Sequence, residues 1–468
     1  MYKYLLCWRY LRTRYIALAS IISVMLGVAT MIVVNSVMAG FSTMMQERLH
    51  GTLSDIIVES FSLNGFDNPD EVMAAIEEAV GDDVEALAPS LQLFGYAMIP
   101  VGGGEHLTRE VQIIGVRPQD RARVSEFAEY LYHQPREGQD QPAPAEPTFH
   151  VPDEHRLNTY LGQVYQETEA DNPFKDILEQ DLENLVPADG MILGFALGTV
   201  HRPETGEDMY IAPEGSKVIL HFPSAGKTPE AKTGEFTVVS YFKSGMSEYD
   251  SMQVFVPIER LQFLRGQDGF VNQIQVKARP GADLEQVAQA IRVKLEQKWP
   301  TRFLTSTWEQ KQGPLLAAVQ VEQNILNILL FFIIAVAGFG ILGIFSMIVV
   351  EKTKDIGILK ALGASDSGIR GIFLAYGLTL GMVGSLVGMT GGLLFVKYIN
   401  EIEDGLSVIT GREVFDDSIY YFPEIPTLVE PMTVAWIVGG TLLIAVAASV
   451  WPAQRAARMH PVRALRYE

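Results

Sequence analysis

Four long apolar segments that contain no charged residue constrain this chain more than any other feature of its sequence. They occupy residues 15–46, 323–350, 371–396 and 431–454. A helix needs about 20 apolar residues to cross the hydrocarbon core of a bilayer, so each segment is long enough to span a membrane. The sequence therefore predicts a membrane protein with four transmembrane helices, and most classes of soluble enzyme are disfavoured.

A long region with many charged residues separates the first apolar segment from the second, whereas the last three segments follow one another closely. This spacing predicts one transmembrane helix, one large domain outside the membrane and then three further transmembrane helices. The expected divisions are an N-terminal segment at 1–14, helix 1 with its stalk at 15–46, the large domain at 47–322 with a variable insertion at 118–187, helix 2 at 323–350, a short loop at 351–370, helix 3 at 371–396, an outer loop at 397–430, helix 4 at 431–454 and a C-terminal tail at 455–468.

The distribution of charge predicts how the chain crosses the membrane. The formal net charge is −20, yet Lys and Arg concentrate in 1–14, 351–370 and 455–468, while Asp and Glu dominate 47–322 and 397–430. Lys and Arg next to membrane spans stay on the cytoplasmic side. We therefore expect a multi-pass protein of the inner (cytoplasmic) membrane, with both termini in the cytoplasm and the acidic regions outside.

The first apolar segment has an alternative interpretation as a secretory signal, because basic residues precede it and Val37, Met38 and Ala39 are typical of a cleavage site. Its apolar length is about twice that of a signal core, so we favour a retained helix. Cys7 is the only cysteine, which excludes an intrachain disulfide.

The two ends of the large domain carry similar patterns. Each predicts a strand, then an amphipathic helix, then a second strand. Between them, residues 118–187 look different, because 139–147 are rich in Pro and acidic residues, and this pattern predicts an exposed loop or a small insertion. The pattern predicts a mixed α+β domain, with strands at 56–58, 217–222, 235–242, 252–257, 274–278 and 302–306 and helices at 69–80 and 284–295.

No motif in the sequence supports a catalytic centre. Residues 225–228 have the ending of a nucleotide-binding loop, but His221 stands where its first glycine belongs. His150 and His155 are the nearest approach to a metal pair, and a solvated loop explains them better. We therefore expect a chain that is not an enzyme, holds no metal or cofactor and has no nucleic-acid partner.

The apolar segments themselves contain no ionisable residue, which argues against an ion-coupled transporter. The third segment carries glycines at spacings of three and four, so they share one helix face. Such a face allows close packing against another helix, within this chain or in a second copy. The glycines of this face are Gly377, Gly381, Gly384, Gly388 and Gly392.

The short basic loop at 351–370 predicts a helix with one apolar side. Ile356, Leu359 and Leu362 recur at a spacing of three. Two interpretations stay open, a helix at the membrane surface or a ridge that docks into a groove of a soluble partner.

Several stretches resemble a known family. EKTKDIGILKALGAS at 351–365 and the chain end PVRALRYE resemble FtsX-like ABC-transporter permeases, as does the order of one span, one large domain and three spans. Within that family, GMILGFALG at 190–198, YFKSGMSEYDSMQVFVPIERLQFL at 241–264 and IYYFPEIPT at 419–427 are similar to the LolC and LolE lipoprotein-releasing permeases.

The resemblance implies an α-helical membrane protein with a large MacB-like α+β periplasmic domain between helices 1 and 2. A separate ABC-type ATPase dimer would bind ATP and Mg and dock on the 351–370 loop. The chain would pair with a second permease copy or a paralogue, extract a lipoprotein from the inner membrane and pass it to a periplasmic carrier. An FtsX-like mechanotransmission regulator of a cell-wall hydrolase and a MacB-like efflux permease are the alternatives.

Three sets of candidate residues follow from this resemblance and from residue chemistry. Met side chains adapt to irregular apolar ligands, which favours an acyl-chain cavity lined by Met and Phe. Ordinary helix packing or contact with lipid would explain the same residues. The loop at 222–234 occupies the place of a carrier-binding hook, with an ordinary hairpin tip as the alternative. The expected ATPase-docking residues are Lys352, Lys354, Asp355, Ile356, Ile358, Leu359, Lys360, Leu362 and Gly363; those of an acyl-chain cavity are Val28, Met31, Ile32, Asn35, Met38, Phe41, Met44, Met45, Ile328, Phe331, Phe332 and Ile341; those of a carrier-binding loop are Pro223, Ser224, Lys227, Thr228, Pro229 and Lys232.

Overall fold

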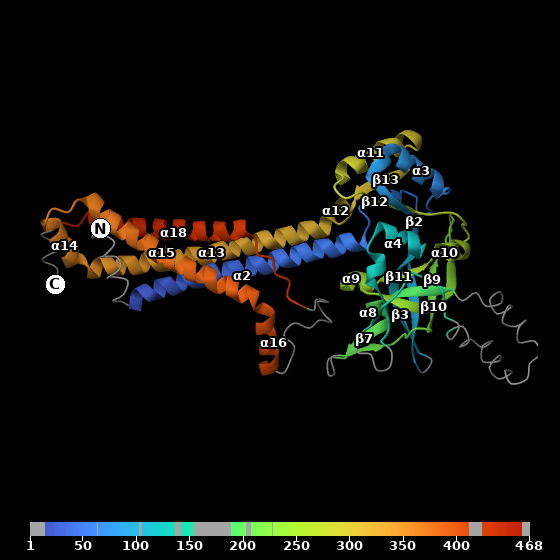
Figure 1. The fold of residues 1–468 in the computed structure, drawn as a ribbon, viewed down its shortest axis with the longest axis horizontal. Coiled ribbons are helices and arrows are strands. Elements are labelled where there is room, and N and C mark those ends of the chain that lie inside the picture. Colours follow the sequence, from blue (N-terminus) through green and yellow to red (C-terminus); the bar gives the residue numbers. More distant parts are fainter. Residues whose placement is uncertain are drawn as a thin grey trace, which may run out of the picture. The chain divides into compact units, whose positions relative to one another are not determined.

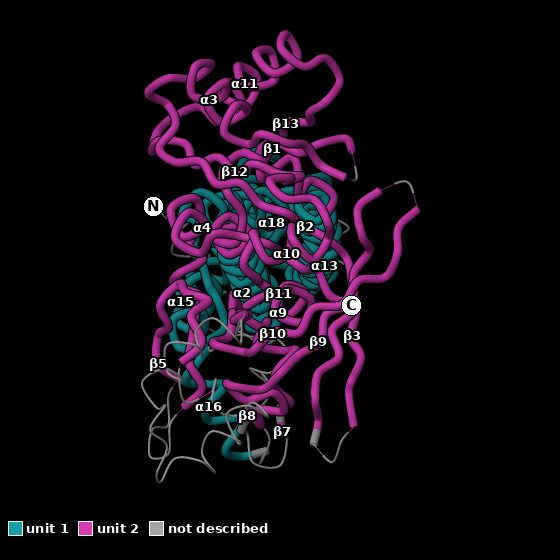
Figure 2. The backbone as a smooth tube through the Cα atoms, turned by 90° about the vertical axis from the view of Figure 1, so that its right-hand side faces the viewer, with its two compact units in different colours: residues 1–45, 315–415, 422–468 teal, residues 46–314, 416–421 magenta. Residues whose placement is uncertain are grey.

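The chain divides into a helical unit and an αβ unit (Figure 2). The helical unit comprises residues 1–45, 315–415 and 422–468, and the αβ unit comprises residues 46–314 and 416–421. The computed structural model describes residues 15–410 and 424–460, apart from residues 63, 103–104, 136–141, 153–154, 156–188, 203–206 and 227.

Four long helices contribute to the helical unit: α2 (Tyr15–Thr52), α13 (Gly313–Glu351), α15 (Asp366–Lys397) and α18 (Pro431–Ala457). Each is long and apolar enough to cross a membrane, so the prediction of four such helices is confirmed. The short helix α14 (Thr353–Ala361) joins α13 to α15, and α16 (Ile399–Thr410) follows α15 (Figure 1). The sequence pattern predicted a plain loop at 397–430 and missed α16.

Small residues bring the helices of this unit together. A Cβ atom at Gly381 would lie 2.8 Å from the Cβ of Ala445 on α18. On the same helix, a Cβ at Gly388 would lie 2.6 Å from the carbonyl oxygen of Met25 on α2. The glycine face of α15 therefore contacts α18 through Gly377 and Gly381, and α2 through Gly384, Gly388 and Gly392.

The outer part of the αβ unit's sheet is built from the two ends of its sequence. Strand β1 (Ile56–Ser60) pairs antiparallel with β12 (Gln273–Ala278) on one side and with β13 (Phe303–Thr307) on the other. Helices α3 (Pro69–Val80) and α11 (Leu284–Lys298) bury Ile76 and Ile291 in the same core as these strands. Both predicted strand–helix–strand patterns are present.

The same sheet continues into the middle of the unit. Its strand order is β13-β1-β12-β2-β3-β11-β6-β10-β4-β5, and β9 pairs with both β10 and β2. A separate pair joins β7 to β8. The remaining elements are β2 (Val84–Gly102), β3 (Glu105–Val116), β4 (Leu131–His133), β5 (Ala143–Pro144), β6 (Gly190–Gly194), β7 (Thr199–Arg202), β8 (Glu207–Tyr210), β9 (Lys217–Pro223), β10 (Ala231–Phe242) and β11 (Gln253–Pro257), with the helices α4 (Pro118–Val124), α8 (Phe195–Gly198), α9 (Ser247–Asp250), α10 (Ile258–Arg265) and α12 (Trp308–Lys311) and the 3₁₀ turns at Gly81–Asp83 and Phe127–Tyr130.

The described part of the predicted insertion at 118–187 contributes several side chains to a core, although residues 142–144 in its Pro-rich stretch are exposed. Phe127, Leu131 and Val151 are buried in a second core of the αβ unit, together with Phe242 and Phe255. A few large side chains make these contacts, so the segment lacks the regular apolar spacing that marks a strand or helix. The rest of the insertion, 156–188, lies outside the described residues.

Candidate functional site

One short segment of the αβ unit is hydrogen-bonded to a residue near the end of α2 and to the residue that precedes α13. Arg48, near the end of α2, donates from Nη1 to the carbonyl oxygen of Gly245 over 2.5 Å. Gln312, which directly precedes α13, donates from Nε2 to the hydroxyl of Tyr249 over 2.7 Å. Residues 244–250, here named the joint segment, therefore contact residues from the end of one long helix and from just before the next.

Asp250 organises the joint segment from inside. Its carboxylate is fully buried. It accepts hydrogen bonds from the backbone N–H and the hydroxyl of Ser244, both at 2.8 Å, and from the N–H of Gly245 at 3.2 Å. Burial raises the pKa of Asp250 to about 6, against the opposing effect of these hydrogen bonds.

Gly245 gives this segment its shape. Its φ of 73° lies in the left-handed region, which side chains rarely adopt, and a Cβ there would overlap the Arg48 guanidinium. Glycine is therefore required where Arg48 approaches.

The end of α2 is held by two further groups. Arg121 on α4 is buried and donates from Nη2 to the carbonyl oxygen of Thr52 over 2.7 Å, which places a cation at the negative end of the helix dipole. Asp55 lies 2.6 Å from His50 Nε2 and accepts the N–H of Ala278 over 2.8 Å. Burial opposes ionisation of Asp55, but these hydrogen bonds and the nearby Lys277 hold its pKa below the ordinary value.

The predicted docking residues on and around α14 do not form one exposed face. Ile356 is buried within the helical unit and Leu359 is half-buried, whereas Ile358 and Leu362 are 49% and 80% exposed. Lys354 and Gly363 are exposed too. The exposed apolar surface of this loop therefore centres on Ile358 and Leu362.

Lys360 has an internal role that its position in a basic loop concealed. Its ammonium donates to the carbonyl oxygens of Ala457, over 2.5 Å, and Met459, over 2.9 Å, at the end of α18. It also lies 3.0 Å from Asp366 at the start of α15. Lys352 pairs with Asp355 over 2.8 Å.

The twelve predicted cavity residues lie in different environments. Val28, Ile32 and Ile341 are buried in the core of the helical unit. Half-buried positions on α2 are Met31, Asn35, Met38, Phe41, Met44 and Met45, whereas Ile328, Phe331 and Phe332 on α13 are exposed. Asn35 donates to the carbonyl oxygen of Met31 over 3.0 Å within its own helix.

The predicted carrier-binding loop is the tip of the β9–β10 hairpin. Pro223 pairs with Ala231 at the base of the tip, and the N–H of Ser224 donates to the carbonyl oxygen of Glu230 over 2.7 Å. Thr228 and Pro229 are exposed, and Lys232 lies 3.4 Å from the Glu230 carboxylate. Lys227 lies outside the described residues.

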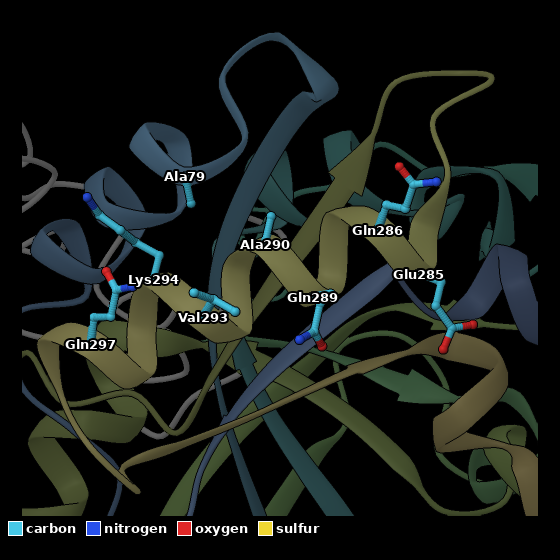
Figure 3. A pocket seen from close by; sticks show the side chains of 8 residues that line it. All are labelled: Ala79, Glu285, Gln286, Gln289, Ala290, Val293, Lys294 and Gln297. Carbon is cyan, nitrogen blue, oxygen red and sulfur yellow. The ribbon is translucent and has the colours of Figure 1, made fainter.

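A hollow on the outer side of α11 is lined mainly by Gln and Ala side chains, with Ala79 of α3 at one edge (Figure 3). The Lys294 ammonium in this lining pairs with Glu78 over 2.8 Å. Across the described parts of the chain, no group of three or more His, Cys, Asp or Glu side chains could hold a metal ion.

Sequence reasoning missed Arg48, Arg121 and Asp250. The signal available for Asp250 was its position in a short Ser- and Gly-containing stretch, 244–250, where a buried acid can accept several backbone N–H groups. No pattern pointed to Arg48 or Arg121, because their partners are backbone carbonyl groups far away in the sequence.

Comparison with known proteins shows which family this chain resembles. Residues 327–461 match the FtsX-like permease C-terminal family. The predicted resemblance to FtsX-like ABC-transporter permeases is therefore confirmed, and the matched residues cover most of α13 and all of α14, α15, α16 and α18.

Similar proteins narrow the class. The lipoprotein-releasing system transmembrane protein LolC of Neisseria meningitidis serogroup B is 26% identical over 468 residues, which cover 98% of each chain. LolC of Haemophilus influenzae is 33% identical over 174 residues, covering 37% of this chain and 41% of that protein, and LolE of the same organism is 28% identical over 167 residues, covering 36% and 40%. The resemblance to the LolC and LolE permeases is thus confirmed.

One solved structure aligns with part of this chain, with low sequence identity and a low TM-score. The periplasmic region of MacB from Actinobacillus actinomycetemcomitans aligns with 57% of this chain and 95% of its own, at 11% identity and a TM-score of 0.28.

Proposed function

We propose that this chain is the permease subunit of an ABC transporter that extracts lipoproteins from the inner membrane and passes them to a periplasmic carrier. A separate ATPase dimer supplies the energy from ATP with Mg, and this chain does no covalent chemistry itself. The observation that carries the proposal is the similarity to a LolC protein along 98% of both chains.

The proposed arrangement in the membrane follows the charge distribution. Both termini and the 351–370 loop lie in the cytoplasm, where Lys and Arg are retained. The αβ unit lies outside the cytoplasm as a domain between helices 1 and 2. The 397–430 segment, between helices 3 and 4, also lies outside. A second permease, either another copy or a LolE-like paralogue, pairs with this chain. The two permeases bind the ATPase dimer together and form no channel.

Motion passes between the two sides through α2 and α13 in this proposal. Both helices are continuous, α2 over Tyr15–Thr52 and α13 over Gly313–Glu351. At their outer ends, Arg48 and Gln312 bond to the joint segment, residues 244–250. A shift of either helix would therefore move the same segment of the αβ unit.

Transfer in a purified system tests the function. The chain, its ATPase and its permease partner are reconstituted in vesicles that contain a fluorescent triacylated lipoprotein, and the carrier is added outside. We expect lipoprotein to appear on the carrier only with hydrolysable ATP. Equal transfer with and without ATP, or none under either condition, contradicts the proposal, and activation of an added cell-wall hydrolase would favour the regulator instead.

The ATPase docks on the exposed apolar surface of α14 and its following turn in this proposal. Leu362→Asp would bury an unpaired carboxylate, which costs several kcal/mol and is enough to break a micromolar complex. We expect the ATPase to be lost on copurification, and Leu359→Asp to weaken it less because that side chain is half-buried. Leu304→Asp, an exposed leucine of the αβ unit, is the matched control, and wild-type copurification of Leu362→Asp would remove this surface from the proposal.

The β9–β10 hairpin tip contacts the carrier in this proposal. Its support is the exposure of Thr228 and Pro229 on a tip held by the Ser224–Glu230 bond. Replacing residues 225–229 with Asn-Gly keeps a tight hairpin but removes the tip. We expect ATPase association to persist and lipoprotein transfer to stop. Unchanged transfer would show that the carrier binds elsewhere.

Acyl chains contact the outer half of α2 in this proposal, at the half-buried residues Met38, Phe41 and Met44. Photo-crosslinkers at these positions should capture lipoprotein without nucleotide and lose it when ATP binds. A crosslinker at Phe339 on α13, 71% exposed, is the control and should capture bulk phospholipid in both states. Phospholipid alone at all four positions would contradict the assignment.

A further inference from the structure

Helix α16 has an apolar side that is not accounted for by the proposed transport steps. In its sequence, INEIEDGLSVIT, the residues Ile399, Ile402, Leu406 and Ile409 recur at helical spacing and share one face. Glu401 and Asp404 lie away from this face. The helix is therefore amphipathic, although it belongs to a segment that is acidic as a whole.

The orientation of α16 is the reverse of that of an amphipathic helix in water. Ile402 is 43% exposed and Ile409 is 82% exposed, so the apolar face points away from the rest of the helical unit. Asn400 faces inward, where its Oδ1 accepts the backbone N–H of Ile425 over 2.9 Å, and Glu401 and Asp404 are exposed. An aqueous environment would favour the opposite orientation, since it rewards burial of apolar surface.

The position of α16 indicates which environment covers that face. The helix begins two residues after α15 ends at Lys397, and it turns away from the direction of α15 (Figure 1). Lys397 and Tyr398 occupy the turn, with the Lys397 ammonium 5.3 Å from the centre of the Tyr398 ring. Tyrosine is typical of the membrane–water interface, and a lysine near the end of a span extends its ammonium to that level. A helix that starts at this level can reach acyl chains directly.

We propose that α16 lies in the plane of the outer membrane–water interface, with Ile402, Leu406 and Ile409 among the lipid acyl chains. This inference rests on the transmembrane arrangement of the proposed function, in which α15 spans the bilayer. Glu401 and Asp404 face water. Because the polar side is acidic, the contact depends on apolar burial and needs no anionic lipid, unlike the usual basic interfacial helix.

Such a helix would fix the depth of the outer end of α15. A short amphipathic helix at the interface resists both withdrawal into water and movement into the hydrocarbon core. The 397–430 segment is then anchored at the level from which the proposed substrate leaves the membrane.

Fluorescence quenching of the full chain in phosphatidylcholine vesicles tests the placement. Replacing Cys7 with serine removes the only native thiol, after which single cysteines at Ile402, Ile409 and Asp404 are labelled with an environment-sensitive dye. Iodide is added on both sides of the membrane. We expect the labels at Ile402→Cys and Ile409→Cys to be quenched several-fold more by a doxyl-labelled phospholipid than by this iodide. The Asp404→Cys label, from the acidic side of the same helix, should show the reverse.

A fourth label separates failure of this inference from failure of the membrane arrangement. Leu386 is exposed and lies within α15. If Leu386→Cys is quenched by the lipid probe while Ile402→Cys is quenched by iodide, α15 spans the bilayer and the placement of α16 is wrong. Labels at 402 and 409 that neither agent reaches would show that protein covers this face, which also overturns the proposal. An iodide-quenched label at 386 would overturn both.

Discussion

The two units of this protein differ in the side chains that make their closest interior contacts. In the αβ unit, Phe127, Phe242 and Phe255 are buried against one another. In the helical unit, Phe339 and Trp436 are exposed, whereas Ser385 and Ser449 are buried. The helical unit therefore exposes large apolar side chains and brings its helices together at small residues, although Phe345 and Tyr376 are also buried in its core.

The difference reflects the solvent that surrounds each unit. In water, burial of apolar surface drives folding at about 25 cal/mol per Å². In lipid that driving force between helices is absent, so helices associate through close packing of small residues and through hydrogen bonds. The predictions below test this contrast by changing comparable residues in both units.

The largest effect is expected for Phe255→Ala in the αβ unit. The Phe255 ring lies 4.8 Å from the Phe127 ring and 4.9 Å from the Phe242 ring, centre to centre. Its removal leaves a cavity and should lower the free energy of unfolding by about 3–5 kcal/mol. Hydrogen exchange of the unit's strands in nanodiscs measures the loss. Phe339→Ala on α13 is the control, and an equal loss of protection there would contradict the contrast between the units.

A somewhat smaller effect is expected for Gly388→Leu in the helical unit. The first added carbon would lie 2.6 Å from the Met25 carbonyl oxygen, and backbone cannot move aside as a flexible side chain can. Overpacking typically costs about 1–3 kcal/mol, and contact with backbone favours the upper end. A pair of introduced cysteines, one on α2 and one on α15, should therefore form a disulfide more slowly than in the parent.

Gly391→Leu is the matched control, because no atom of another helix lies within 4 Å of the Cβ position at Gly391. We expect its crosslinking rate to equal that of the parent. A similar fall for both variants would mean that any bulky residue on α15 disturbs the unit, and the close contact at Gly388 would not be its cause.

Much of the fold was predictable because its signals are local. Uncharged apolar runs marked α2, α13, α15 and α18, and amphipathic spacing marked α3 and α11. The core contribution of Phe127 and Leu131 was not predictable, because isolated large residues in a polar segment acquire partners only from distant strands. Helix α16 was missed since acidic residues in a short segment between two apolar runs suggested a loop.

Less of the candidate sites was predictable, for a related reason. The glycine spacing of α15 pointed to close packing, but it could not identify α2 and α18 as separate partners for different glycines. In the 351–370 loop, apolar spacing suggested one ridge, whereas Ile356 packs inward and Leu362 points outward. Helical spacing gives the relative directions of side chains, and only tertiary structure shows which direction is the interior.

Asp250→Asn should change the pH dependence of the joint segment. Burial raises the pKa of Asp250 to about 6 in the folded chain from an unfolded value near 3.8, so the folded state binds the proton more tightly. Stability of the segment should therefore fall as pH rises through the range from about 4 to 6, by up to about 3 kcal/mol at 1.36 kcal/mol per pKa unit. The Asn variant cannot ionise and should lack this fall, although it loses the Gly245 hydrogen bond.

Hydrogen exchange of residues 244–251, corrected for the intrinsic effect of pH, measures this dependence. Glu248→Gln changes an exposed carboxylate in the same segment and should retain the parent's profile. A profile for Asp250→Asn that falls with pH as the parent does would assign the effect to another group.

The smallest effect is expected for Lys360→Met, which tests whether the helical unit also depends on a buried polar contact. Lys360 is 12% exposed at its side chain and donates to two carbonyl oxygens at the end of α18. Methionine keeps most of the length but leaves those carbonyl groups without the cation, at a cost of about 1–2 kcal/mol. Hydrogen exchange of α14 should therefore rise.

Because Ile358 and Leu362 remain exposed, we expect ATPase copurification to persist while ATP-driven transfer weakens. Lys354→Met, on an exposed position of the same helix, should alter neither exchange nor transfer. If Lys360→Met instead abolishes ATPase binding and leaves α14 exchange unchanged, Lys360 contacts the ATPase directly and does not act by fixing α14 to α18.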